Sequence, residues 1–145
     1  MPRPRFPVQR RFADLDPYGH VNNVAFLEYV QEARVQFLAS IGRIDVQKEG
    51  HAVVRQEIDY IRPLKFSLAP IEVEFRIEKL RRASYTLVWE IHDDDGQISA
   101  RGRTLMTSWD IAAGAPTRLD DKRRARMQDY MDETTAGTDP EGDTA

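Results

Sequence analysis

The chain has 145 residues, of which 41% are hydrophobic and 31% charged, and its formal net charge is −3. This is the composition of a globular protein, and the length allows one domain with a genuine core but excludes two ordinary domains. The absence of cysteine excludes disulfides and thiolate chemistry, and no apolar run approaches the roughly 18 residues of a membrane span. We therefore expect a soluble cytoplasmic protein that does not enter a membrane.

The charge is unevenly distributed along the chain. Residues 132–145 carry five carboxylates and no Lys or Arg, so we expect an acidic disordered tail after a single domain over residues 1–131. The remainder holds 21 basic and 19 acidic residues. That balance is too weak for a nucleic-acid-binding protein, which concentrates positive charge on one face. The three histidines, His20, His51 and His92, show no metal-ligand spacing to one another, and this predicts no metal site.

A strand followed by a long helix is expected in the first third of the chain. Apolar residues within 6–13 predict a short first strand with loose boundaries. Over Val24–Ile41, apolar side chains recur at three-, four-, seven- and eight-residue spacings, which predicts a largely buried helix. Asn22 or Asn23 is a favourable N-cap, and Gly42 stands at the expected end.

Strands are expected to fill most of residues 51–109. Apolar and polar side chains alternate there with a period of two, most clearly over residues 71–78. The sequence Asp-Gly at residues 95–96 predicts a hairpin turn, and Gly102 within the last strand indicates a bulge or a close backbone approach. Residues 118–131 predict a short C-terminal helix. The fold class is therefore α+β, with a curled antiparallel sheet of about five strands wrapped around one long central helix.

Polar groups are concentrated in the loop before the long helix, which reads DLDPYGHVNN over residues 14–23. A carboxylate held beside unpaired helix N–H groups can attack, or direct water at, a carbonyl that those N–H groups polarise. Asp16 precedes a proline and is equally suited to forming an Asx turn. Asp14 is better suited to accepting backbone hydrogen bonds as a scaffold. His20 has two interpretations, as a group that positions Asp16 or a water, and as a structural hydrogen-bonding partner.

This loop, together with Ile58–Leu64 and the strand that contains Gly102, resembles the hotdog-fold acyl-CoA thioesterases of the 4-hydroxybenzoyl-CoA thioesterase branch. The resemblance covers roughly residues 6–110. It implies a hotdog fold, hydrolysis of an acyl-coenzyme A thioester, and neither metal nor redox cofactor. It also implies a homodimer or homotetramer with the substrate at the subunit interface. The motif places the catalytic carboxylate on Asp16 and a backbone N–H that orients the thioester carbonyl near Asn23, but it does not specify the acyl group.

Further residues are expected near the substrate. Gly19 and Asn22 belong to the same motif, and Tyr60 either lines the acyl pocket or fills the core, the core being favoured. Guanidinium groups suit the phosphates of coenzyme A. The cationic candidates are Arg62, Lys65, Arg81, Arg82 and Arg103, with the turn that holds Arg81 and Arg82 favoured. The helix residues Glu28 and Glu32 are minor alternatives as carboxylates, because another thioesterase branch uses a helix carboxylate.

Two other functions fit parts of the same pattern. A non-catalytic module that binds acyl-CoA would use the same fold, although the retained Asp16 argues against it. A hotdog dehydratase is disfavoured, because His20 is followed by Val-Asn-Asn and not by the Phe-Pro that such enzymes carry.

Overall fold

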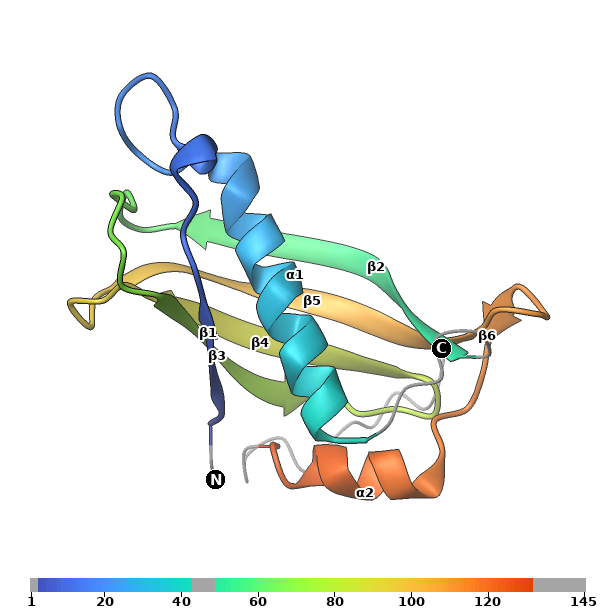
Figure 1. The fold of residues 1–145 in the computed structure, drawn as a ribbon. Helices are drawn as coiled ribbons and strands as arrows, with labels where there is room; N and C mark the ends of the chain where they lie inside the picture. Colours follow the sequence, from blue (N-terminus) through green and yellow to red (C-terminus); the bar gives the residue numbers. More distant parts are fainter. Residues whose placement is uncertain (1–2, 43–48, 132–145) are drawn as a thin grey trace.

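The computed structural model describes residues 3–42 and 49–131. The predicted acidic tail lies outside these residues. The elements in chain order are β1 (Arg5–Val8), a 3₁₀ turn (Phe12–Asp14), α1 (Asn23–Ser40), β2 (Glu49–Tyr60), β3 (Ile71–Glu78), β4 (Ser84–His92), β5 (Ile98–Asp110), β6 (Ala115–Pro116) and α2 (Asp121–Gln128). The strands form one antiparallel sheet in the order β1-β3-β4-β5-β2, and the two-residue β6 pairs with β5. Figure 1 shows the sheet curling around α1, as predicted.

Helix α1 packs its apolar side chains against one face of the sheet. The side chain of Asn22 accepts a hydrogen bond from the Val24 N–H at 3.0 Å and so caps the helix. Near the other end, the ring of Phe37 stacks on Phe75 of β3, with centroids 5.3 Å apart. The predicted helix is confirmed within one residue at each end, and its buried side chains share the core with the inward side chains of β3 and β4.

The first strand is shorter than the sequence predicts. β1 ends at Val8, whereas the prediction extended to residue 13. The guanidinium of Arg10 is buried and donates hydrogen bonds to Asp93 and to the carbonyls of Lys65 and Ala69. These bonds draw the chain away from the sheet edge. Phe12 then lies in the 3₁₀ turn with 75% of its surface exposed, so it was wrongly counted as a strand residue.

The four long strands agree with the predicted alternation. On β3 and β4 the odd-numbered residues face α1 and are buried, while the even-numbered ones lie on the outer face of the sheet. Gly96 has a φ of 81°, as the predicted Asp-Gly turn requires. Strand β2 forms one edge of the sheet, and a register shift between Val53 and Arg55 leaves Val54 as an extra residue that is 57% exposed.

Helix α2 confirms a C-terminal helix but is shorter than predicted. It begins after Asp120, whose side chain caps it, and its Met127 is buried in the common core. Figure 1 shows α2 beside the C-terminal end of α1. Within residues 3–42 and 49–131, no helix has the length and apolar character needed to cross a membrane.

Gly102 is required by a close approach inside the sheet. A Cβ at this position would lie 2.2 Å from the Glu57 carbonyl oxygen and 2.5 Å from the Trp89 ring. The Trp89 indole is fixed by a hydrogen bond to the Thr104 hydroxyl at 3.0 Å, so the ring cannot move aside freely. The predicted close backbone approach is therefore confirmed, and it lets Trp89 cover the middle of β5.

We expect Gly102→Ala to lower the free energy of unfolding by about 3 kcal/mol, at the upper end of the cost of overpacking. Gly50→Ala is the matched control, because its added Cβ would meet nothing closer than Ile111 at 3.7 Å. Urea denaturation of both variants measures the difference. Equal stability of the two variants would contradict the role given to Gly102.

Candidate active site

The loop between Leu15 and Val21 is closed by its own backbone and holds the carboxylate of Asp16. The Asp16 N–H donates to the His20 carbonyl at 2.7 Å, and the Gly19 N–H donates to the Asp16 carbonyl at 3.0 Å. Asp16 Oδ1 accepts the N–H groups of Tyr18 at 2.9 Å and His20 at 3.1 Å. Oδ2 of Asp16 accepts no hydrogen bond from the described residues. The same carboxylate thus builds the turn with one oxygen and leaves the other available.

Asp14 is a scaffold residue at the base of this loop. Its carboxylate accepts hydrogen bonds from the Tyr29 hydroxyl at 2.7 Å and from the Arg11 guanidinium at 2.8 and 3.0 Å. Its carbonyl accepts the Asn22 N–H at 2.8 Å. Burial alone would raise the pKa of Asp14, but the hydrogen bonds from Arg11 and Tyr29 and the charge of Arg11 hold it below its usual value. Asp14 therefore joins the loop to α1 as an ionised group.

The start of α1 presents an unpaired backbone donor beside this loop. Asn22 caps the Val24 N–H with its side chain and the Ala25 N–H with its carbonyl. The Asn23 N–H, between them, has no hydrogen-bond partner among the described residues. The Tyr60 hydroxyl, from the end of β2, donates to the Asn23 carbonyl at 3.0 Å. Tyr60 is 47% exposed and so lines the site surface, and the favoured prediction that it fills the core was wrong.

A second loop lies against the first. The Val21 N–H donates to the Leu64 carbonyl at 2.7 Å, and His20 pairs with Lys65 in an isolated bridge. The imidazole of His20 is half-buried and makes no hydrogen bond to a described residue. Arg62 lies in the same second loop, exposed and 3.6 Å from Asp95. Of the predicted cations, Lys65 is thus the one whose backbone pairs with the Asp16 loop, and Arg62 lies three residues before it.

The favoured arginines lie elsewhere on the chain. Arg81 and Arg82 occupy the turn between β3 and β4, where their carbonyls accept hydrogen bonds from Arg124, in the middle of α2. This is the end of the sheet near the C-terminus of α1, whereas the loop before α1 lies at the N-terminal end of that helix (Figure 1). Arg103 is on the outer face of the sheet, paired with Glu78. Within one chain, none of the three joins the Asp16 loop.

The helix carboxylates also lie apart from the free oxygen of Asp16. Glu28 pairs with Arg11 at 2.9 Å, and Glu32 is exposed one turn farther along α1. Both line an open cavity of about 710 Å³ between α1 and the stretch that runs from the end of β1 to Arg11. Glu28 therefore extends the scaffold around Asp14.

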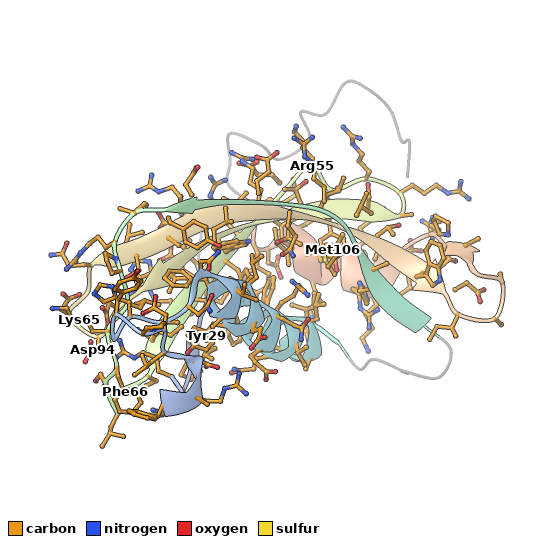
Figure 2. The ribbon with its side chains drawn as sticks, turned by 90° about the horizontal axis from the view of Figure 1, so that it is seen from above. Tyr29, Arg55, Lys65, Phe66, Asp94 and Met106 are labelled. Atoms are coloured by element: carbon orange, nitrogen blue, oxygen red, sulfur yellow. The ribbon has the colours of Figure 1, made fainter. Side chains whose placement is uncertain are left out.

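Exposed apolar side chains around the site were not singled out from the sequence. Figure 2 shows Phe66 and Lys65 at the same end of the molecule. Phe66 packs edge-on against Phe12, with centroids 5.8 Å apart, and Tyr18 in the Asp16 loop is 85% exposed. These aromatic residues lie in loops, where hydrophobic side chains follow no periodic pattern. The turn-forming residues around them are the only sequence signal that could have predicted their exposure.

Comparison with known proteins identifies related sequences and folds. The family model described as the thioesterase-like superfamily matches residues 10–132. A Thermus thermophilus thioesterase solved with coenzyme A and zinc is 32% identical and has a TM-score of 0.75, with 87% of this chain and 97% of that one covered. The PA5185 protein of Pseudomonas aeruginosa is 26% identical, with a TM-score of 0.80 and coverage of 91% and 99%. The YsmA protein of Bacillus subtilis (strain 168) is 23% identical over 121 residues, covering 83% of this chain and 82% of that protein.

The ion pair of Asp14 predicts a specific loss of stability in acid. The pKa of Asp14 in the folded state lies below its ordinary value of 3.8. The ionised carboxylate therefore stabilises the fold at pH values above 3.8. The contribution disappears as the pH falls through the lower folded pKa. We expect the free energy of unfolding to fall more steeply between about pH 5 and pH 2 for the wild type than for Asp14→Asn. Parallel curves from urea denaturation would contradict this assignment.

Proposed function

Because the chain belongs to the thioesterase-like superfamily, we propose that this thioester hydrolase acts on an acyl-coenzyme A through the carboxylate of Asp16. One observation carries the assignment. Asp16 Oδ1 is fixed by two backbone N–H groups while Oδ2 makes no hydrogen bond to the described residues. A carboxylate that is oriented on one side and open on the other is ready to take a proton or to attack a carbonyl.

The reaction needs few protein groups. In the general-base route, Oδ2 takes a proton from water as the water oxygen attacks the thioester carbonyl carbon. The tetrahedral intermediate then collapses, the C–S bond breaks, and coenzyme A leaves as a thiolate that accepts the proton. In the nucleophilic route, Oδ2 itself attacks the carbonyl carbon, and the C–S bond breaks to release coenzyme A as a thiolate. Water then hydrolyses the resulting anhydride, which restores the Asp16 carboxylate and supplies the proton that the thiolate takes up. A thiolate leaves readily, so neither route requires a strong general acid.

The N-terminus of α1 is the proposed electrophilic clamp. Negative charge develops on the carbonyl oxygen during attack, and an unpaired N–H at a helix N-terminus stabilises such charge. The Asn23 N–H is such a donor, and the Tyr60 hydrogen bond to the Asn23 carbonyl holds the following peptide group and so the first turn of α1. Gly19 and Asn22 shape the turn and the cap on either side of the reacting groups. His20 is proposed to orient the water or Asp16 from within the same turn.

The substrate class follows from the neighbouring surface. The related Thermus thermophilus protein was solved with coenzyme A, and we propose that Arg62 and Lys65 contact the phosphates of that group here. The exposed aromatic rings of Tyr60, Phe12 and Phe66 offer apolar surface to the acyl portion. A coenzyme A substrate would place the protein in the cytoplasm.

A second copy of the chain is proposed to complete the site. β2 is a 12-residue edge strand with no neighbour on its outer side among residues 3–42 and 49–131. Such an edge pairs readily with another strand, and the exposed Val53 and Val54 would be covered by the pairing. In the oligomer, the Arg81–Arg82 turn of one subunit is proposed to reach the substrate of the other.

The variant Asp16→Asn tests the chemistry. Its side-chain oxygen can still accept the N–H groups of Tyr18 and His20, so the loop is kept while the charge is lost. We expect kcat/KM on a panel of acyl-coenzyme A substrates to fall by at least about 100-fold, with little change in the free energy of unfolding. Thiol release measures the rate.

Asp59→Asn is the matched control, because Asp59 is exposed on β2 and lines the cavity on the outer face of the sheet. It is expected to retain the wild-type rate. Full activity in folded Asp16→Asn would refute the proposed role of Asp16.

The variant Val54→Lys tests the proposed dimer. Placing a charge at the exposed edge of β2 should shift the protein toward the monomer and reduce activity with it, measured by sedimentation and by thiol release. Val35→Lys is the control, because Val35 is 59% exposed on α1 and Val54 is 57% exposed. A monomeric wild type, or equal dissociation of both variants, would contradict an interface at β2.

A further inference from the structure

A buried histidine on the outer face of the sheet faces two carboxylates. His92 lies at the end of β4 with only 8% of its surface exposed, and its Nε2 has no hydrogen-bond partner among the described residues. This atom lies 3.5 Å from Oε2 of Glu74 and 3.7 Å from Oε1 of Glu90. A buried imidazole nitrogen without a partner is costly, and it is uncommon in native proteins.

The register of β3 and β4 creates this cluster. Glu74 is directly opposite Glu90, and His92 follows two residues later on the same face of β4. Their neighbours Val73, Phe75 and Ile91 point the other way, into the core beneath α1. The cluster therefore lies across the sheet from the helix, and it takes no part in the proposed thioester chemistry.

We propose that Glu74, Glu90 and His92 bind a divalent transition-metal ion such as Zn²⁺. Ligand atoms of all three residues lie within 4.8 Å of one another. A tetrahedral zinc with bonds of about 2.0–2.1 Å separates its ligand atoms by about 3.4 Å, close to the observed distances from Nε2. An ion at this point would bond to Nε2 and to an oxygen of each carboxylate, which gives the unpartnered nitrogen a ligand role. One imidazole with two carboxylates suits zinc or manganese better than calcium or magnesium.

The surroundings provide support and access. Arg5, in β1, donates a hydrogen bond of 3.1 Å to Oε2 of Glu74. A hydrogen bond of this kind fixes the orientation of a carboxylate that binds a metal. Arg5 is 43% exposed on its side chain, so water screens its charge. A cavity of about 340 Å³ on the outer face is lined by both Glu74 and Glu90. The same cavity is lined by Arg3, Arg76, Arg101 and Arg103, and Arg3 lies 3.6 Å from Oε1 of Glu74, so an ion would reach the carboxylates alongside these guanidinium groups.

Zinc titration of the untagged full chain tests the site. Calorimetry with ZnCl₂ in excess Mg²⁺ should show one strong site per chain, and Zn²⁺ should raise the melting temperature by binding the folded state. Loss of a hydrogen bond to a metal ligand alone weakens binding 10- to 100-fold, so we expect His92→Gln and Glu90→Gln to weaken it by more than about tenfold. Two variants are used so that one remains informative if the other does not fold.

Glu72→Gln is the matched control. Glu72 lies opposite His92 on the same outer face and carries the same charge as Glu74, but it is not one of the three ligands. It should bind Zn²⁺ like the wild type. The proposal is overturned if the wild type binds no Zn²⁺, if binding persists in both ligand variants, or if Glu72→Gln weakens binding equally.

Discussion

The buried guanidinium of Arg10 joins the segments at the end of the molecule that holds the Asp16 loop. It lies between β1 and the 3₁₀ turn and is 3% exposed. Its nitrogens donate to the carbonyls of Lys65 and Ala69 and to the carboxylate of Asp93. A buried charge that lost these partners would cost several kcal/mol. The chain therefore leaves the sheet at a fixed point, and the loops after β2 and β4 are drawn to the same place.

From that point the two aspartates of the site loop take different roles. The carboxylate of Asp14 accepts hydrogen bonds from Arg11 and Tyr29, and these bonds connect the loop to α1. Asp16 uses one oxygen for the turn and keeps the other open. The difference arises from position, because the carboxylate of Asp14 bonds to Tyr29 on α1, whereas that of Asp16 bonds to N–H groups of its own loop. Asp14 therefore ties the loop to α1, while Asp16 keeps one oxygen free of hydrogen bonds to the described residues.

The local patterns of the sequence were sufficient to predict the helices and strands. They were insufficient to predict the contacts between these elements. Strand alternation and the Asn22 cap predicted β2 to β5 and α1 closely because both are local properties of the chain. The end of β1 was missed because Arg10 bonds to residues more than fifty positions away. Tyr60 was assigned to the core because it falls in step with the apolar residues that alternate along the strand. It lies at the end of an edge strand, however, where the inner face of the sheet is open to solvent. The DLDPYGHVNN loop could be located from the sequence, whereas the free oxygen of Asp16 could not.

The same reasoning explains why Glu74, Glu90 and His92 escaped a search by spacing. Metal-ligand spacing along one chain segment finds sites built on a helix or a loop, but a site across two strands depends on their register. Here β3 and β4 must place Phe75 and Trp89 together under α1, and this pairing fixes Glu74 opposite Glu90 on the other face. The core therefore determines the geometry of a polar cluster that it never touches. Evolution could alter those outer residues without disturbing the helix side, and this freedom makes the outer face of the sheet a suitable place for a second binding function.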